Sequence, residues 1–115
     1  MSSAYLENNL SDPVADVHRA LASLQEELEA VDYYNQRADR TQDADSKAIL
    51  LHNRDEEIEH ASMLLEWLRR RIPAFDEALK TYLFTTAPIT EIEASSTGDN
   101  DGMVASGDLK IGALR

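Results

Sequence analysis

The segment DEEIEHASMLLEWL, residues 55–68, decides how this chain is organised, because it places a carboxylate and an imidazole on the apolar face of a helix. Positions on that face repeat about every 3.5 residues. They are occupied by Leu50, Asn53, Glu57, His60, Leu64 and Trp67. Residues three apart project from one face of a helix, so Glu57 and His60 can converge on one metal ion. The alternative is a polar pair that sets the register of a coiled coil.

The composition restricts both the class of protein and the kind of metal site. The chain has 115 residues, 43% of them hydrophobic, which predicts one small domain with a thin core. With 11 Lys and Arg against 22 Asp and Glu, the net charge of -11 argues against binding nucleic acid or an anionic membrane. Because the sequence contains no cysteine, metal ligands must be oxygen and imidazole. Without a signal peptide or an apolar membrane span, we expect a soluble, cytoplasmic protein.

The first long helix is predicted to begin at Asp12 and to end near Arg40. Asp12 followed by Pro13 is typical of a helix start with Asp12 as the N-cap, and residues 1–12 are expected to be disordered. Residues 14–40 contain no Gly or Pro and carry leucines at three- and four-residue steps. The polar stretch that follows is so short that the next helix must run antiparallel to the first.

A second long helix is predicted over residues 43–71, capped by either Asp43 or Asp45. It ends in three arginines, which complement the negative end of the helix dipole. Pro73 ends this helix, and a short third helix is expected over residues 74–84. The predicted fold class is therefore all-α, an antiparallel two-helix hairpin with a short C-terminal helix.

Glu27 places a second carboxylate within an apolar stripe, this time on the first helix. The stripe consists of Ala20, Leu24, Glu27, Val31 and Tyr34. Counted from the turn at a helical rise of 1.5 Å, Glu27 and Glu57 lie ~21 Å and ~24 Å away, so Glu27, Glu57 and His60 can meet. A di-iron four-helix site needs two such ligand sets, and this chain has only two long helices. We therefore expect the bundle to form only when two copies dimerise.

The ligand types indicate which metal such a site would hold. Oxygen and imidazole ligands with open positions suit Fe(II), Mn(II) and, less well, Zn(II), and redox iron is the most natural use. Tyr34, on the same stripe as Glu27, could hydrogen-bond a ligand, although packing is the alternative. Elsewhere, His18 and His52 lack a comparable carboxylate partner.

Four further glutamates flank the predicted ligands. They are Glu26 and Glu29 on the first helix and Glu56 and Glu59 on the second. They point to other sides of their helices, so they form either an exposed secondary cation site or, more simply, a solvated acidic face. The sequence pattern alone favours the solvated face.

The C-terminal part of the chain differs from the helical part in composition. Residues 87–108 contain five acidic and no basic residues, which is typical of a flexible acidic linker. Residues 109–115 then restore apolar character with Leu109, Ile111 and Leu114. This last segment is either a docking peptide on a tether or a frayed terminus.

Over residues 18–86 the sequence resembles the encapsulated ferritins. The resemblance is carried by near-verbatim blocks, LQEELEAVDYYNQRAD (24–39), HNRDEEIEHA (52–61), LLEWLRRR (64–71) and YLFT (82–85). It implies a ferritin-like helical hairpin domain over residues 13–86, whose four-helix bundle forms between two subunits. It also implies that dimers assemble into an annular homodecamer with a di-iron ferroxidase centre at the dimer interface.

The resemblance also implies roles for individual residues. Glu27, Glu57 and His60 resemble the iron ligands of the family, and Tyr34 resembles the tyrosine beside the centre. Tyr33 departs from the family pattern, in which a tryptophan commonly precedes that tyrosine.

The outer acidic residues and the C-terminus resemble further parts of the family. Glu26 and Glu29 resemble the glutamates of an outer metal-uptake site. Residues 109–115 are similar to the cargo peptides that dock enzymes inside encapsulin nanocompartments. The function predicted is a ferroxidase that oxidises Fe(II) to Fe(III) with dioxygen and delivers iron for storage in an encapsulin shell. The alternatives are a non-redox divalent-metal-binding protein and a structural oligomerisation module.

Overall fold

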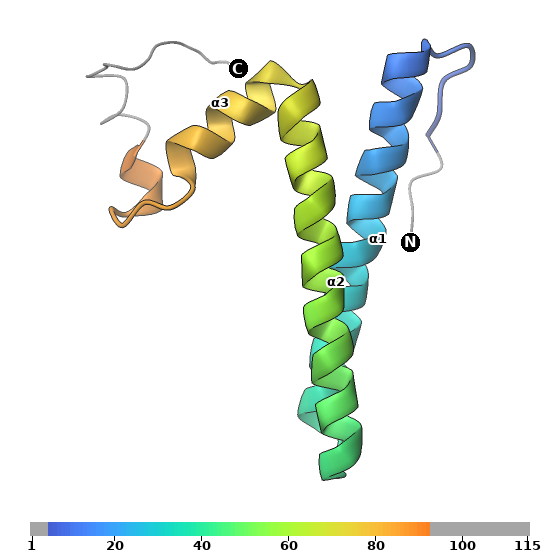
Figure 1. The fold of residues 1–115 in the computed structure, drawn as a ribbon, viewed down its shortest axis with the longest axis vertical. Helices are drawn as coiled ribbons and strands as arrows, with labels where there is room; N and C mark the ends of the chain where they lie inside the picture. The colour runs from blue at the N-terminus through green and yellow to red at the C-terminus, as the bar shows by residue number, and fades with distance from the viewer. Residues whose placement is uncertain (1–4, 93–115) are drawn as a thin grey trace. The chain divides into compact units, whose positions relative to one another are not determined.

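The computed structural model describes residues 5–92, and the regular structure within them is helical (Figure 1). The helices are α1 (Asp12–Arg40), α2 (Ala44–Arg71) and α3 (Pro73–Tyr82), which confirms the predicted all-α class. None of the helices within residues 5–92 is both long and apolar enough to span a membrane. The chain divides into two units, Met1–Arg71 and Ile72–Arg115, which are described in turn.

The first helix begins at Asp12, as the sequence predicts, but its N-cap is one residue earlier than predicted. Ser11, not Asp12, is the N-cap: its backbone is extended and its side chain accepts a hydrogen bond from the Val14 N–H at 3.4 Å. Asp12 is instead the first helical residue, where its carboxylate faces the positive end of the helix dipole. The predicted N-cap is therefore wrong, because Ser11 also offers a short side-chain oxygen one position earlier.

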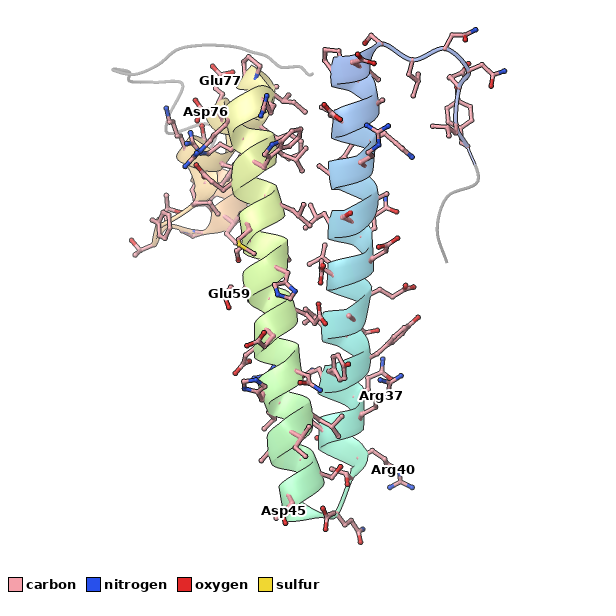
Figure 2. The ribbon with its side chains drawn as sticks, turned by 45° about the vertical axis from the view of Figure 1, so that its right-hand side comes forward. Arg37, Arg40, Asp45, Glu59, Asp76 and Glu77 are labelled. Atoms are coloured by element: carbon pink, nitrogen blue, oxygen red, sulfur yellow. The ribbon has the colours of Figure 1, made fainter. Side chains whose placement is uncertain are left out.

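A three-residue connection turns the chain from α1 into α2. Thr41 is extended, and its N–H still bonds to the Arg37 carbonyl at 3.0 Å. Asp43 then caps α2, since its Oδ2 accepts the Ser46 N–H at 2.8 Å, while Asp45 lies within the first turn. With so short a connection, α1 and α2 run antiparallel and side by side (Figures 1 and 2).

The core between α1 and α2 is small. Its buried residues are Ala20, Ala38, Ala61 and Leu68. The alanines let the two helices approach closely, but they bury little apolar surface. At the same time Leu28 and Ile58, each directly after a predicted ligand, keep 54% and 45% of their surface exposed. This is the burial expected of half a bundle.

A side-chain clamp also joins the two helices near the turn. Arg54 of α2 donates a hydrogen bond through Nη1 to Oδ1 of Asn35 on α1 at 2.9 Å. The Nε and Nη2 of the same guanidinium bond to the Asp55 carboxylate at 3.2 and 3.0 Å. Because Arg54 is only 30% exposed and is held on both sides, it fixes how far α2 can slide along α1.

The second unit begins with α3, which starts at Pro73 and ends at Tyr82, two residues before its predicted end. Leu83 is extended, and Phe84 has a φ of 60°, in the left-handed region, so a right-handed helix cannot continue through it. Residues 89–92 form a further helical turn, in which Ile92 is buried. Most of the predicted linker and the whole peptide over residues 109–115 lie outside the described residues.

Candidate metal centre

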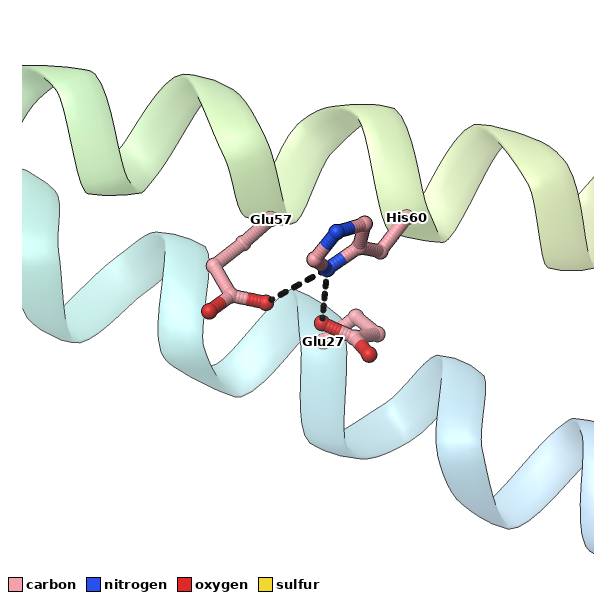
Figure 3. A group of neighbouring side chains, drawn as sticks. All are labelled: Glu27, Glu57 and His60. Carbon is pink, nitrogen blue, oxygen red and sulfur yellow. Dashed lines mark ion pairs between the residues drawn. The ribbon is translucent and has the colours of Figure 1, made fainter.

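The structure brings Glu27 of α1 together with Glu57 and His60 of α2, as the helix-rise count predicts (Figure 3). One ligand atom from each side chain lies within 4.8 Å of the others. Glu57 and His60 share a face because they are three residues apart, and the short turn sets Glu27 level with them. The site therefore depends on two features of the sequence, the spacing on α2 and the length of the connection.

The distances within this group are those of loose ion pairs. His60 Nδ1 lies 3.4 Å from Glu57 Oε1 and 3.6 Å from Glu27 Oε1 (Figure 3). Both exceed the usual 2.7–3.2 Å of a nitrogen–oxygen hydrogen bond. The exposed fractions are 23% for Glu57, 25% for Glu27 and 42% for His60, so the group is partly desolvated but remains open to solvent.

The pKa shifts of the group arise from the close approach and partial burial of its three side chains. A hydrogen bond with the Glu57 carboxyl, followed by burial and repulsion from its charge, raises the pKa of Glu27. For His60, desolvation by itself lowers the pKa, but the nearby carboxylates of Glu57 and Glu27 outweigh it, so the net pKa is raised. Two carboxylates thus face one imidazole, and a divalent cation would balance their charge better.

The donor set fits a first-row divalent metal. Two carboxylate oxygens and one imidazole nitrogen suit Fe(II), Mn(II) or Zn(II), and three ligands leave coordination positions open. A carboxylate can also bridge two ions when a second set of ligands faces the first.

Tyr34, predicted to lie beside the centre, is half-buried but is not one of the three converging side chains. The Arg37 guanidinium lies 5.6 Å from the centroid of its ring and 5.8 Å from that of Tyr33. A hydrogen bond to Glu29 raises the pKa of the exposed Tyr33. Sequence reasoning missed Arg37, although its spacing of three and four residues from the tyrosines was the available signal.

The flanking glutamates do not join the metal group. Glu26, Glu56 and Glu59 are exposed, Glu29 is half-buried, and Glu59 projects from α2 on the side away from α1 (Figure 2). In the part of the chain that the structure describes, these four residues form no second group of three converging metal-binding side chains.

His52 has one exposed carboxylate neighbour, whereas His60 has two, so the prediction concerned only the lack of a comparable partner. The Nε2 of His52 lies 3.6 Å from Oε2 of Glu56, one helical turn away. The i, i+4 spacing was the signal that sequence reasoning overlooked. With 70% of the histidine side chain and 51% of the glutamate exposed, water screens the interaction strongly.

Carboxylates and an imidazole that converge between packed helices are the side-chain types that ferritin-like carboxylate proteins use to bind metal. The chain belongs to the EncFtn-like family, which matches residues 3–86, and is an encapsulated-ferritin-like protein as its resemblance predicts.

Relatives match most of the chain. It is 58% identical over 99 residues to a ferritin-like protein of Thermotoga maritima, with 86% of this chain and 85% of that protein covered. It is 50% identical over 115 residues to the encapsulated ferritin-like protein of Rhodospirillum rubrum, with 92% of this chain and 82% of that protein covered. Among solved structures, the crystal structure of protein ne0167 from Nitrosomonas europaea is similar with a TM-score of 0.73 and 62% identity, covering 76% of this chain and 98% of that one.

Proposed function

We propose that this protein is a ferroxidase that oxidises Fe(II) to Fe(III) with dioxygen at a di-iron centre formed between two subunits. The observation that carries the proposal is the convergence of Glu27, Glu57 and His60 within 4.8 Å in a chain of the EncFtn-like family. Fe(II) is the substrate, and each ion gives up one electron to dioxygen. Two adjacent ferrous ions can share electron delivery to dioxygen, which one ion does less readily.

Each ligand has a separate part in holding the substrate ions. The carboxylates of Glu27 and Glu57 offset the positive charge of the ions. His60 supplies a neutral nitrogen once the incoming ion has displaced its proton. Glu57 is our candidate for the bridging ligand. Tyr34 would hydrogen-bond a ligand, and Glu26 and Glu29 would attract cations toward the centre from outside.

A second copy of the chain would complete the centre. One hairpin provides a Glu and a Glu-x-x-His pair, whereas a di-iron bundle uses two of each. A two-fold axis would place two identical sets face to face. Leu28 and Ile58 support this arrangement, because they flank the ligands and remain about half exposed within their own hairpin.

Delivery to a shell is the second part of the proposal. The R. rubrum relative is named as encapsulated, and this chain ends in residues 109–115, which resemble a cargo peptide. We therefore propose that the subunits assemble into an annular decamer, that residues 109–115 dock to an encapsulin shell, and that the ferric product is stored inside it.

The experiment that tests the chemistry compares wild type, Glu57→Gln and Glu77→Gln. Fe(II) is mixed with air-saturated protein, and ferric absorbance, oxygen consumption and oligomer mass are followed together. Glu57→Gln removes one ligand charge at nearly constant volume and should oxidise Fe(II) no faster than protein-free solution. Glu77→Gln removes the same charge from exposed α3 and should match wild type. A wild-type rate in Glu57→Gln would refute the assignment.

The same experiment separates the alternatives. Binding of Fe(II) or Zn(II) without oxygen consumption would make the protein a non-redox metal-binding module. If removal of metal left the oligomer and its stability unchanged and no metal bound, Glu27, Glu57 and His60 would be a structural polar group. This second alternative is tested because His60 forms ion pairs with Glu57 and Glu27, at 3.4 and 3.6 Å, within the chain itself.

A further inference from the structure

An exposed thioether lies next to one of the three converging side chains on α2. Met63 keeps 60% of its surface exposed, although methionine is among the residue types most often buried. It follows His60 by three residues, so the two are neighbours on the helix surface. At about 100° per residue, the buried Ala61 and Leu68 lie on one side of His60 and Met63 lies on the other. Met63 therefore borders the side on which His60, 42% exposed, is open to solvent.

The surroundings of Met63 give small solutes access to its sulfur. A hollow of 420 Å³ on α2 is lined in part by Met63, Glu59 and Trp67. The Arg71 guanidinium lies 4.6 Å from the centroid of the Trp67 ring and shields it, whereas Met63 stays exposed. The chain has no cysteine, and Met63 is the only methionine between residues 5 and 92. In this part of the chain its thioether is thus the one sulfur that a peroxide can oxidise.

The electron count of the proposed reaction supplies such an oxidant, and this step rests on the proposed function. Two Fe(II) ions give up two electrons, whereas reduction of dioxygen to two waters takes four. With two electrons and two protons, dioxygen becomes one molecule of hydrogen peroxide while two Fe(II) become two Fe(III). Because hydrogen peroxide is uncharged, the carboxylates of Glu27 and Glu57 do not hold it, and it leaves by the open side of the group.

We propose that Met63 is a sacrificial site that captures this hydrogen peroxide and becomes methionine sulfoxide. A sulfur lone pair attacks one peroxide oxygen, the S–O bond forms and the O–O bond breaks. The second oxygen leaves as water, taking the proton of the first. Sulfur loses two electrons and the peroxide gains them. The capture removes an oxidant that further Fe(II) would otherwise convert to hydroxyl radical beside His60.

The test follows the fate of Met63 during iron oxidation. Full-length wild type, Met63→Leu and Glu57→Gln are mixed with a few Fe(II) per chain in air-saturated solution and stopped with chelator. Peptide mass spectrometry measures the sulfoxide at Met63 and at Met103, an internal reference far from the ligands in the sequence. Dioxygen consumed per Fe(II) and peroxide released are recorded. Parallel iron-free samples receive the same amount of reagent hydrogen peroxide.

In wild type, the ratio of Met63 to Met103 sulfoxide should be at least several-fold higher with Fe(II) than with reagent peroxide, because the oxidant arises beside Met63. Met63→Leu conserves side-chain volume, so it should oxidise Fe(II) at the wild-type rate and release more peroxide. Glu57→Gln should lose the excess at Met63 with Fe(II), whereas reagent peroxide should oxidise its Met63 as in wild type.

Equal Met63 to Met103 ratios in the two treatments of wild type would overturn the proposal, since Met63 would then be an exposed thioether like any other. Consumption of one dioxygen for every four Fe(II), with Met63 intact, would also overturn it, because no peroxide would leave the centre. In both cases rapid iron oxidation would leave the ferroxidase standing. A wild type that oxidises Fe(II) no faster than protein-free solution would refute both proposals.

Discussion

Two ionic clusters on α2 differ in how well their charges are matched. Around Glu66, one carboxylate is held by two arginines at 2.7 and 2.8 Å, and hydrogen bonds from Arg69 and then Arg70 lower the pKa of Glu66 to about 2. Around His60, two carboxylates share one imidazole at 3.4 and 3.6 Å, and the pKa of Glu27 is raised. The negative charge of the first cluster is neutralised within the chain. The second cluster keeps an excess of negative charge that a cation could neutralise.

The largest expected effect comes from removing a ligand carboxylate from the second cluster. Glu57→Gln should weaken binding of Mn(II) or Zn(II), measured by calorimetric titration, by on the order of 100-fold or more, because one of three charged or nitrogen ligands is lost. Glu66→Gln is the comparison, since it removes the same group from the matched cluster. Equal affinities in the two variants would show that the difference between the clusters has no bearing on metal binding.

A smaller effect is expected from the clamp that aligns the two helices. Arg54→Gln should weaken metal affinity by about tenfold, the size of effect typical of a group that orients a ligand without touching the metal. Because Arg54 and Asn35 form one contact, Asn35→Ala in the Arg54→Gln background should add little. Additive losses in this double-mutant cycle, or an affinity equal to wild type, would show that the clamp does not set the register of the ligands.

The smallest effect concerns pH. The folded-state pKa of Glu66, about 2, lies below its ordinary value of 4.5, so its contribution to stability is present above pH 4.5 and is lost as the pH falls toward 2. Thermal unfolding of wild type and Glu66→Gln should therefore differ at pH 6 and converge near pH 2. Because the cluster is exposed, the difference should be small. A constant difference across this range would show that the Glu66 charge is not responsible.

Much of this arrangement could be predicted from local patterns. Apolar spacing predicts two long helices, and the short connection predicts their pairing. The convergence of Glu27 with Glu57 and His60 could be predicted, because an α-helix has a fixed rise per residue and the turn sets the three residues at one level along the hairpin. The all-α class was predicted correctly for this reason and the family from the resemblance of its sequence blocks, whereas the ligand roles stay predictions.

Other features depend on choices that the sequence leaves nearly balanced. Ser11 and Asp12 both make good caps, and which one caps depends on where the backbone becomes extended. Phe84 has a left-handed backbone conformation just after α3, and no residue type in YLFT predicts it. The bond from Arg54 to Asn35 joins residues on different helices, so no local spacing points to it.

The three-residue connection between α1 and α2 also has a kinetic consequence. Contacts next to the turn close only a short loop, so little chain entropy must be lost before the two helices begin to pair. A hairpin of this topology folds on a scale of roughly microseconds to milliseconds. Encounter between subunits depends on concentration instead, so the rate at which the proposed assembly appears would be set by how quickly newly made chains find one another.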